Sequence, residues 1–150
     1  MKIVRSPLRV SLFGGGSDLP AYYEKHGGLI ISFAIDRCIS LIHNDRPTGG
    51  CRLSYSKVEE VKNWREVEHD LVRAYAEYNH ILLPATITIV GDVPKGTGLG
   101  SSSALSLALA MMYYKNPYDM KVHLPLWKVA KRFEEYTNPH VGIQDFLPAY

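Results

Sequence analysis

A glycine- and serine-rich segment that runs directly into an apolar helix constrains this chain more than any other feature. Residues 101–114 read SSSALSLALAMMYY, a helical segment that is apolar on nearly all sides. Such a helix is internal, so other elements must enclose it. The preceding residues 86–90, TITIV, alternate as a half-buried strand does. The segment therefore predicts a layered domain with a sheet and further helices around a central helix.

The rest of the sequence predicts strands and helices in mixed order. Strands are expected over residues 3–13, 29–33, 37–43, 52–56 and 86–90, and helices over 19–25, 64–80, 101–114 and 124–136. Ser17 or Asp18 is expected to cap the short helix 19–25, and Gly27-Gly28 to end it. This order predicts one layered domain of the α+β or α/β class.

Charge and composition exclude several classes of protein. The net charge is +2, from 17 basic and 15 acidic residues without a basic stripe, so a nucleic-acid partner is not expected. The longest nearly apolar stretch, residues 104–112, is too short to cross a membrane, and the N-terminus has no signal-peptide core. A cytoplasmic protein is therefore expected, with Cys38 and Cys51 as free thiols.

The loop before the central helix has the composition of a phosphate-binding site. Glycines let several N–H groups point at one anion, and the helix N-terminus adds partial positive charge. The Walker pattern does not fit, since Lys95 precedes the glycines, and the Rossmann spacing fails between Gly98 and Gly100. The alternative is a serine-capped helix N-terminus that binds no ligand. The residues expected to hold phosphates are Lys95, Gly96, Thr97, Gly98, Leu99, Gly100, Ser101, Ser102 and Ser103.

Three segments, in order, resemble the signatures of the GHMP kinases (galactokinase, homoserine kinase, mevalonate kinase and phosphomevalonate kinase). Residues 98–104, GLGSSSA, resemble the second signature of the family. Residues 7–20, PLRVSLFGGGSDLP, resemble the first signature in the triple-glycine form of the heptose-phosphate kinase and fucokinase-like branch. Residues 142–145, GIQD, resemble the segment that carries the family's catalytic aspartate.

The resemblance implies a two-layer α+β fold similar to the second domain of ribosomal protein S5, with a left-handed βαβ unit. Residues 1–150 would form the N-terminal, ATP-binding domain, and the C-terminal domain would be absent from this chain. The partners that this leaves open are a second copy of the chain and a separate C-terminal half.

The resemblance also assigns catalytic and metal-binding roles. Asp145 would be the catalytic base and Arg9 its cationic neighbour, while ATP occupies the loop and Mg²⁺ is held by Ser102 and Glu134, with Glu135 as the alternative carboxylate. One hydroxyl, one carboxylate and the nucleotide phosphates suit magnesium, which prefers hard oxygen ligands.

The acceptor is expected to be a small sugar or sugar phosphate, bound by Gly14, Gly15, Gly16, Ser17 and Asp18. The glycines would let the sugar approach the backbone, and the Asp18 carboxylate would accept hydrogen bonds from the sugar hydroxyls. The triple-glycine form implies D-glycero-D-manno-heptose 7-phosphate, phosphorylated at the anomeric hydroxyl. The alternatives are a fucokinase-like kinase of a neutral sugar and a non-catalytic nucleotide-binding fragment.

Overall fold

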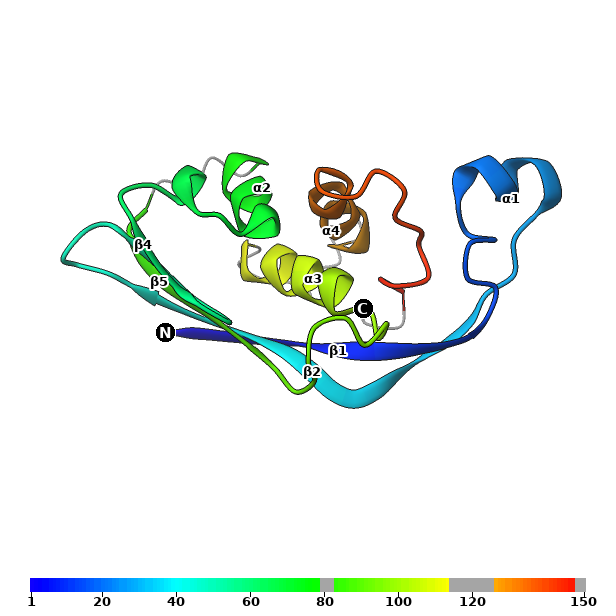
Figure 1. The fold of residues 1–150 in the computed structure, drawn as a ribbon, viewed down its shortest axis with the longest axis horizontal. Helices are drawn as coiled ribbons and strands as arrows, with labels where there is room; N and C mark the ends of the chain where they lie inside the picture. The colour runs from blue at the N-terminus through cyan, green and yellow to red at the C-terminus, as the bar shows by residue number, and fades with distance from the viewer. Residues whose placement is uncertain (79–82, 114–125, 148–150) are drawn as a thin grey trace.

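The computed structural model describes residues 1–78, 83–113 and 126–147. In chain order the elements are β1 (Lys2–Phe13), α1 (Pro20–His26), β2 (Ile31–Asp45), β3 (Cys51–Ser54), β4 (Val58–Val61), the 3-10 turn η1 (Trp64–Glu66), α2 (Asp70–Tyr78), β5 (Ala85–Gly91), α3 (Ser101–Tyr113) and α4 (Leu126–Glu135). One sheet has the strand order β1-β2-β5-β3-β4. Helices α2, α3 and α4 lie over one face of this sheet, and α1 lies apart, at the far end of β1 and β2 (Figure 1). The predicted two-layer α+β architecture is confirmed.

The strand β2 is one long strand, so the prediction of two strands over residues 29–33 and 37–43 is wrong. It pairs with β1 in antiparallel register, and the register shifts between the pairs Pro7↔Cys38 and Arg9↔Ala34. Residues 34–36, which separate the two predicted strands, belong to the strand, and the register shift lies in this part of it. An irregularity of this kind lets extra residues stay in a continuous strand while bending it.

The region between β3 and β5 departs most from the sequence-based expectation. The hairpin strand β4 was not predicted, and the helix expected over residues 64–80 is divided into η1 and α2. Asn63 accepts a hydrogen bond from Arg65 N and closes the first short turn, while the Glu59 carboxylate accepts one from Glu68 N before α2 begins. These tertiary and local bonds replace the helical ones that the apolar spacing suggests.

The parallel neighbours β3 and β5 are joined through β4, η1 and α2. The left-handed sense of this connection stays a prediction. Residues 79–80, residue 114 and residues 124–125, which the predicted helices included, lie outside the described residues.

The core lies between the sheet and the helices, with α3 at its centre. Leu107, Leu109 and Ala110 of α3 are fully buried, as is Leu41 of β2, and Phe133 of α4 is 1% exposed. The expectation of an internal helix is therefore confirmed. Cys38 and Cys51 are free thiols, as expected. Within the described ranges, no helix is long and apolar enough to cross a membrane.

Candidate active site

The glycine-serine loop between β5 and α3 turns through backbone conformations that favour glycine. Gly98 has a φ of +72°, and a Cβ there would meet nothing within 4 Å, so conformation rather than packing requires glycine. Gly100 also has a φ of +72°, but a Cβ there would lie 3.2 Å from the Arg9 side chain. The loop therefore opens toward solvent at Gly98 and lies against β1 at Gly100.

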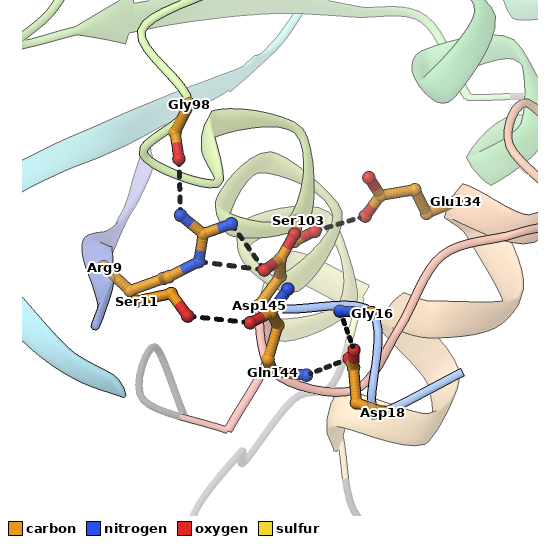
Figure 2. A network of polar contacts seen from close by, with 9 residues as sticks. All are labelled: Arg9, Ser11, Gly16, Asp18, Gly98, Ser103, Glu134, Gln144 and Asp145. Carbon is orange, nitrogen blue, oxygen red and sulfur yellow. Dashed lines mark hydrogen bonds and ion pairs between the residues drawn. The ribbon is translucent and has the colours of Figure 1, made fainter. Parts of the chain in front are cut away.

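Arg9 joins this loop to β1 and to the last described loop of the chain. Its main-chain N–H donates to Leu99 O at 3.1 Å, and its Nη1 donates to Gly98 O at 2.6 Å. Its Nε and Nη2 both donate to Asp145 Oδ1, at 2.8 and 2.5 Å (Figure 2). Arg9 is 8% exposed, and a charge buried to this extent needs such partners.

Asp145 is held by one oxygen only. Both Arg9 donors contact Oδ1, and no described residue hydrogen-bonds to Oδ2. The Asp145 side chain keeps 20% of its surface exposed. The geometry thus leaves one oxygen of an oriented carboxylate able to accept a proton or a hydroxyl group.

Glu134 of α4 lies against the first turn of α3. It is 4% exposed, and its Oε2 accepts a hydrogen bond from the Ser103 hydroxyl at 2.6 Å. Burial raises the pKa of the Glu134 carboxyl above its usual range, and the Ser103 and Ser102 hydroxyls oppose this rise. Ser102 itself is exposed. Glu135 instead pairs with Lys131 on the same helix, so Glu134 is the carboxylate that faces the loop's helix.

The sequence predicted Ser17 or Asp18 as the cap of helix α1, but Asp18 does not cap it. The helix N-cap is Leu19, without a side-chain bond, and Gly27 ends the helix with a positive φ, as expected. Asp18 is 3% exposed, and its carboxylate accepts hydrogen bonds from the main-chain N–H groups of Gly16 and Gln144. The Ser17 hydroxyl bonds to Gly14 O and Leu29 O and also does not cap the helix.

A pocket of about 390 Å³ lies between the glycine turn and the glycine-serine loop. Its walls are residues 9–15 of β1 and the turn, together with Gly98, Leu99 and Gln144. Asp145 is not part of its wall, but its neighbour Arg9 is. Gly14 also has a packing reason to be glycine, since a Cβ at that position would lie 1.8 Å from Leu29 O. Gly14 also lines the pocket, so its predicted contact with the substrate stays a prediction.

The structure brings together residues that sequence reasoning did not select. The Ser11 hydroxyl donates to Gln144 Oε1 at 2.8 Å, beside the Arg9–Asp145 pair (Figure 2). Ser11 follows Arg9 by two residues, so strand alternation places both on one face. That periodicity is the signal that could have identified it. Gln144 adjoins Asp145 in the sequence, but its partner Ser11 is evident only in the fold.

Comparison with known proteins gives the following relatives. The sequence matches the family model described as "GHMP kinases N terminal domain" over residues 64–150. It is 26% identical to the galactokinase of Thermotoga neapolitana over 153 aligned residues, which cover 95% of this chain and 41% of that protein. It is 28% identical to the D-glycero-alpha-D-manno-heptose 7-phosphate kinase of Campylobacter jejuni, with 95% of this chain and 45% of that protein covered.

Solved structures share the fold. A D-glycero-D-manno-heptose 1-phosphate kinase of Bacteroides thetaiotaomicron superposes with a TM-score of 0.78 and 20% identity, covering 99% of this chain and 53% of that one. The mevalonate kinase of Methanococcus jannaschii superposes with a TM-score of 0.74 and 19% identity, covering 99% and 50%. The chain thus spans about half the length of the proteins that it matches.

Proposed function

The chain belongs to the GHMP kinases, and on that premise we propose that it forms the nucleotide-binding half of an ATP-dependent sugar kinase. The observation that carries the proposal is the position of Arg9, which donates to Asp145 and to the carbonyl of Gly98. A carboxylate with one free oxygen is thereby fixed beside a glycine-serine loop. That arrangement suits phosphoryl transfer, because catalysis of this reaction consists mainly of positioning and charge compensation.

In the proposed reaction, the loop from Lys95 to Ser103 holds the phosphates of ATP. Its N–H groups and the N-terminus of α3 favour negative charge at this place. An acceptor hydroxyl attacks the γ-phosphorus, the bond from that phosphorus to the β–γ bridging oxygen breaks, and ADP leaves. Asp145 Oδ2 accepts the hydroxyl proton. Arg9 holds Asp145 by Oδ1 and places positive charge near the transferring group.

The donor set also fits magnesium. Ser102 and Glu134 would hold it, since both offer hard oxygens at the first turn of α3, and magnesium commonly takes one or two protein oxygens together with substrate phosphates. When bound, magnesium neutralises charge on the β- and γ-phosphate oxygens. Ser103 then has a supporting role, because its hydroxyl orients the Glu134 carboxylate.

For the acceptor, we assign the 390 Å³ pocket and the glycine turn, with D-glycero-D-manno-heptose 7-phosphate as the substrate and the anomeric hydroxyl as the attacking group. The pocket volume is of the size that small ligands occupy. The heptose assignment follows from the triple glycine Gly14–Gly16 and from the name of the Campylobacter relative. Galactokinases match with similar identity, so galactose belongs in the test.

The test is a panel of sugars with and without a phosphate, assayed in the full-length protein by ADP release and by the mass of the product. Heptose 7-phosphate should be the best acceptor. Asp145→Asn should lower kcat about 10²-fold or more while ATP affinity is nearly kept, since it removes the base and leaves the glycine-serine loop unchanged. Asp36→Asn, at an exposed aspartate of β2, is the matched control and should match the wild type. A preference for galactose or fucose would refute the heptose assignment, and an Asp145→Asn variant with a third of normal turnover would refute the base.

A further inference from the structure

A buried carboxylate at Asp18 is bonded to main chain from two distant parts of the sequence. Its Oδ1 accepts from Gly16 N at 3.1 Å, and its Oδ2 accepts from Gln144 N at 3.0 Å. The residue is 3% exposed, so these N–H groups replace water as its partners. Bonds from N–H groups to an ionised carboxylate are stronger than bonds between neutral groups. The carboxylate thus joins the glycine turn to the segment that carries Asp145.

The Asp18 carboxylate packs directly against the Cα of Gly142. A Cβ built on Gly142 would lie 1.8 Å from Asp18 Oδ2 and 2.4 Å from Asp18 Cγ. The carboxyl group therefore occupies the space that a side chain at position 142 would need. This contact gives a packing reason for glycine at 142 that depends on Asp18.

The same segment contacts β1 through two side chains. Gln144 accepts from the Ser11 hydroxyl at 2.8 Å, and Asp145 accepts from Arg9. Phe146, which follows directly, is fully buried. Three hydrogen-bonding partners, Asp18, Ser11 and Arg9, therefore hold Gln144 and Asp145 (Figure 2). Of these bonds, only the one to Asp18 acts on the main chain, at the residue before Asp145.

We propose that Asp18 is a positioning residue for catalysis: by binding Gln144 N and packing on Gly142, it sets the backbone from which Asp145 reaches the acceptor. This inference rests on the proposed role of Asp145. It differs from the expectation that Asp18 binds a sugar hydroxyl, because both carboxylate oxygens face main-chain N–H groups. A displacement of about 1 Å at a reacting group can cost up to about 10²-fold in rate, so a positioning role has a measurable effect.

The first test is Asp18→Asn in the full-length protein. The amide keeps the size of the carboxyl group, but its NH₂ must face one of two N–H donors, so one bond is lost. We expect kcat to fall about tenfold or more, with the KM values for ATP and acceptor within about twofold of the wild type. Amide exchange across residues 141–147 should become about tenfold faster. Asp36→Asn should change neither quantity.

A double-mutant cycle tests the packing against Gly142. Gly142→Ala should lower kcat strongly in the wild-type background, where the new Cβ meets the carboxylate. In the Asp18→Ala background, the same change should cost at most about twofold, because the clash is gone. Equal costs in both backgrounds would overturn the proposal.

The two arms separate this proposal from the proposed function. If Asp18→Asn raises the KM for the acceptor tenfold and leaves exchange over residues 141–147 unchanged, then Asp18 contacts the sugar and the proposal is wrong. If the wild type phosphorylates no sugar of the panel, the proposed function fails. Faster amide exchange in Asp18→Asn would then still show that Asp18 holds residues 141–147 in place. Unchanged exchange would show that it does not.

Discussion

Removal of the Arg9 guanidinium should destabilise the protein as well as inactivate it. Arg9→Met keeps an unbranched apolar stem in the space beside Gly100 but deletes all donors of the side chain. Asp145 then loses both bonds at Oδ1, and Gly98 O loses the bond from Nη1. The change therefore leaves a largely buried carboxylate without its cation.

The size of the effect follows from this burial. Removing one partner of a buried ion pair costs about 3–5 kcal/mol, since the other charge remains uncompensated. The Asp145 side chain is 20% exposed, so water partly replaces the lost donors, and we expect the lower end, about 3 kcal/mol. For a protein of 150–250 residues, each kcal/mol lowers Tm by about 2–4 °C, so Tm should fall by about 6–12 °C.

A double-mutant cycle with Asp145→Asn identifies the source of the loss. Without the negative charge at 145, Arg9→Met should cost at least 1 kcal/mol less than it does in the wild type. Urea unfolding of the four proteins at pH 7 gives these free energies of unfolding. Arg52→Met is the matched control, because Arg52 is half exposed in its pair with Glu60, and it should cost less than about 1 kcal/mol. Additive effects of the two changes, within about 0.5 kcal/mol, would refute the ion-pair reasoning.

Three further predictions concern the glycine-serine loop, the buried Glu134 and the exposed apolar residues of β1 and β2. Gly98→Val should abolish ATP binding in calorimetry with the fold kept, whereas Gly49→Val, at a φ of +78° with equally open space, should bind ATP normally. Glu134→Gln should raise the magnesium concentration for half-maximal activity about tenfold or more. The pKa of Glu134 is raised in the folded state, so the folded protein keeps this proton to higher pH than the unfolded chain does. The free energy of unfolding of the wild type therefore falls as the pH rises above the usual carboxyl range. Urea titrations should show that the free energy of unfolding of Glu134→Gln depends less on pH. Residues 1–150 produced alone should associate in light scattering and turn over poorly, and Phe33→Ser should reduce the association, because Phe33 is 47% exposed near Phe13 and Ile31.

Each of these predictions has an opposite result that counts against it. Normal ATP affinity in a folded Gly98→Val variant would remove the loop from nucleotide binding. A pH dependence of stability that Glu134→Gln leaves unchanged would show that Glu134 is not the group responsible. A monodisperse monomer of residues 1–150 would show that the exposed apolar residues do not drive association.

The local elements were predictable from the sequence because short-range patterns determine them. The alternation in β5, the uniformly apolar α3 and the glycines of the loop each carry their own signal, and the structure has all three. The resemblance to the GHMP kinases also rests on contiguous residues, such as 98–104. Three of its motif residues, Arg9, Gly98 and Asp145, do meet in the fold.

Other features depend on partners far along the chain, and only the tertiary structure decided them. Two strands were predicted over residues 29–33 and 37–43, yet β2 stays continuous because β1 pairs with it on both sides of the irregularity. The helix expected over residues 64–80 is interrupted because Glu59, in a neighbouring hairpin, takes the N–H of Glu68. Local propensity cannot encode such competition between bonds.

The roles of individual site residues show the same division. An acidic residue follows the triple glycine in the sequence, and from the sequence we expected it to cap a helix or to bind a sugar. The fold buries the Asp18 carboxylate, and it accepts a hydrogen bond from the main chain of Gln144, 126 residues further along the chain. Similarly, the sequence could not choose between Glu134 and Glu135, while the packing of α4 on α3 turns Glu134 toward Ser103 and leaves Glu135 with Lys131. A charged group is buried where donors converge on it, and the convergence of donors is a property of the folded chain alone.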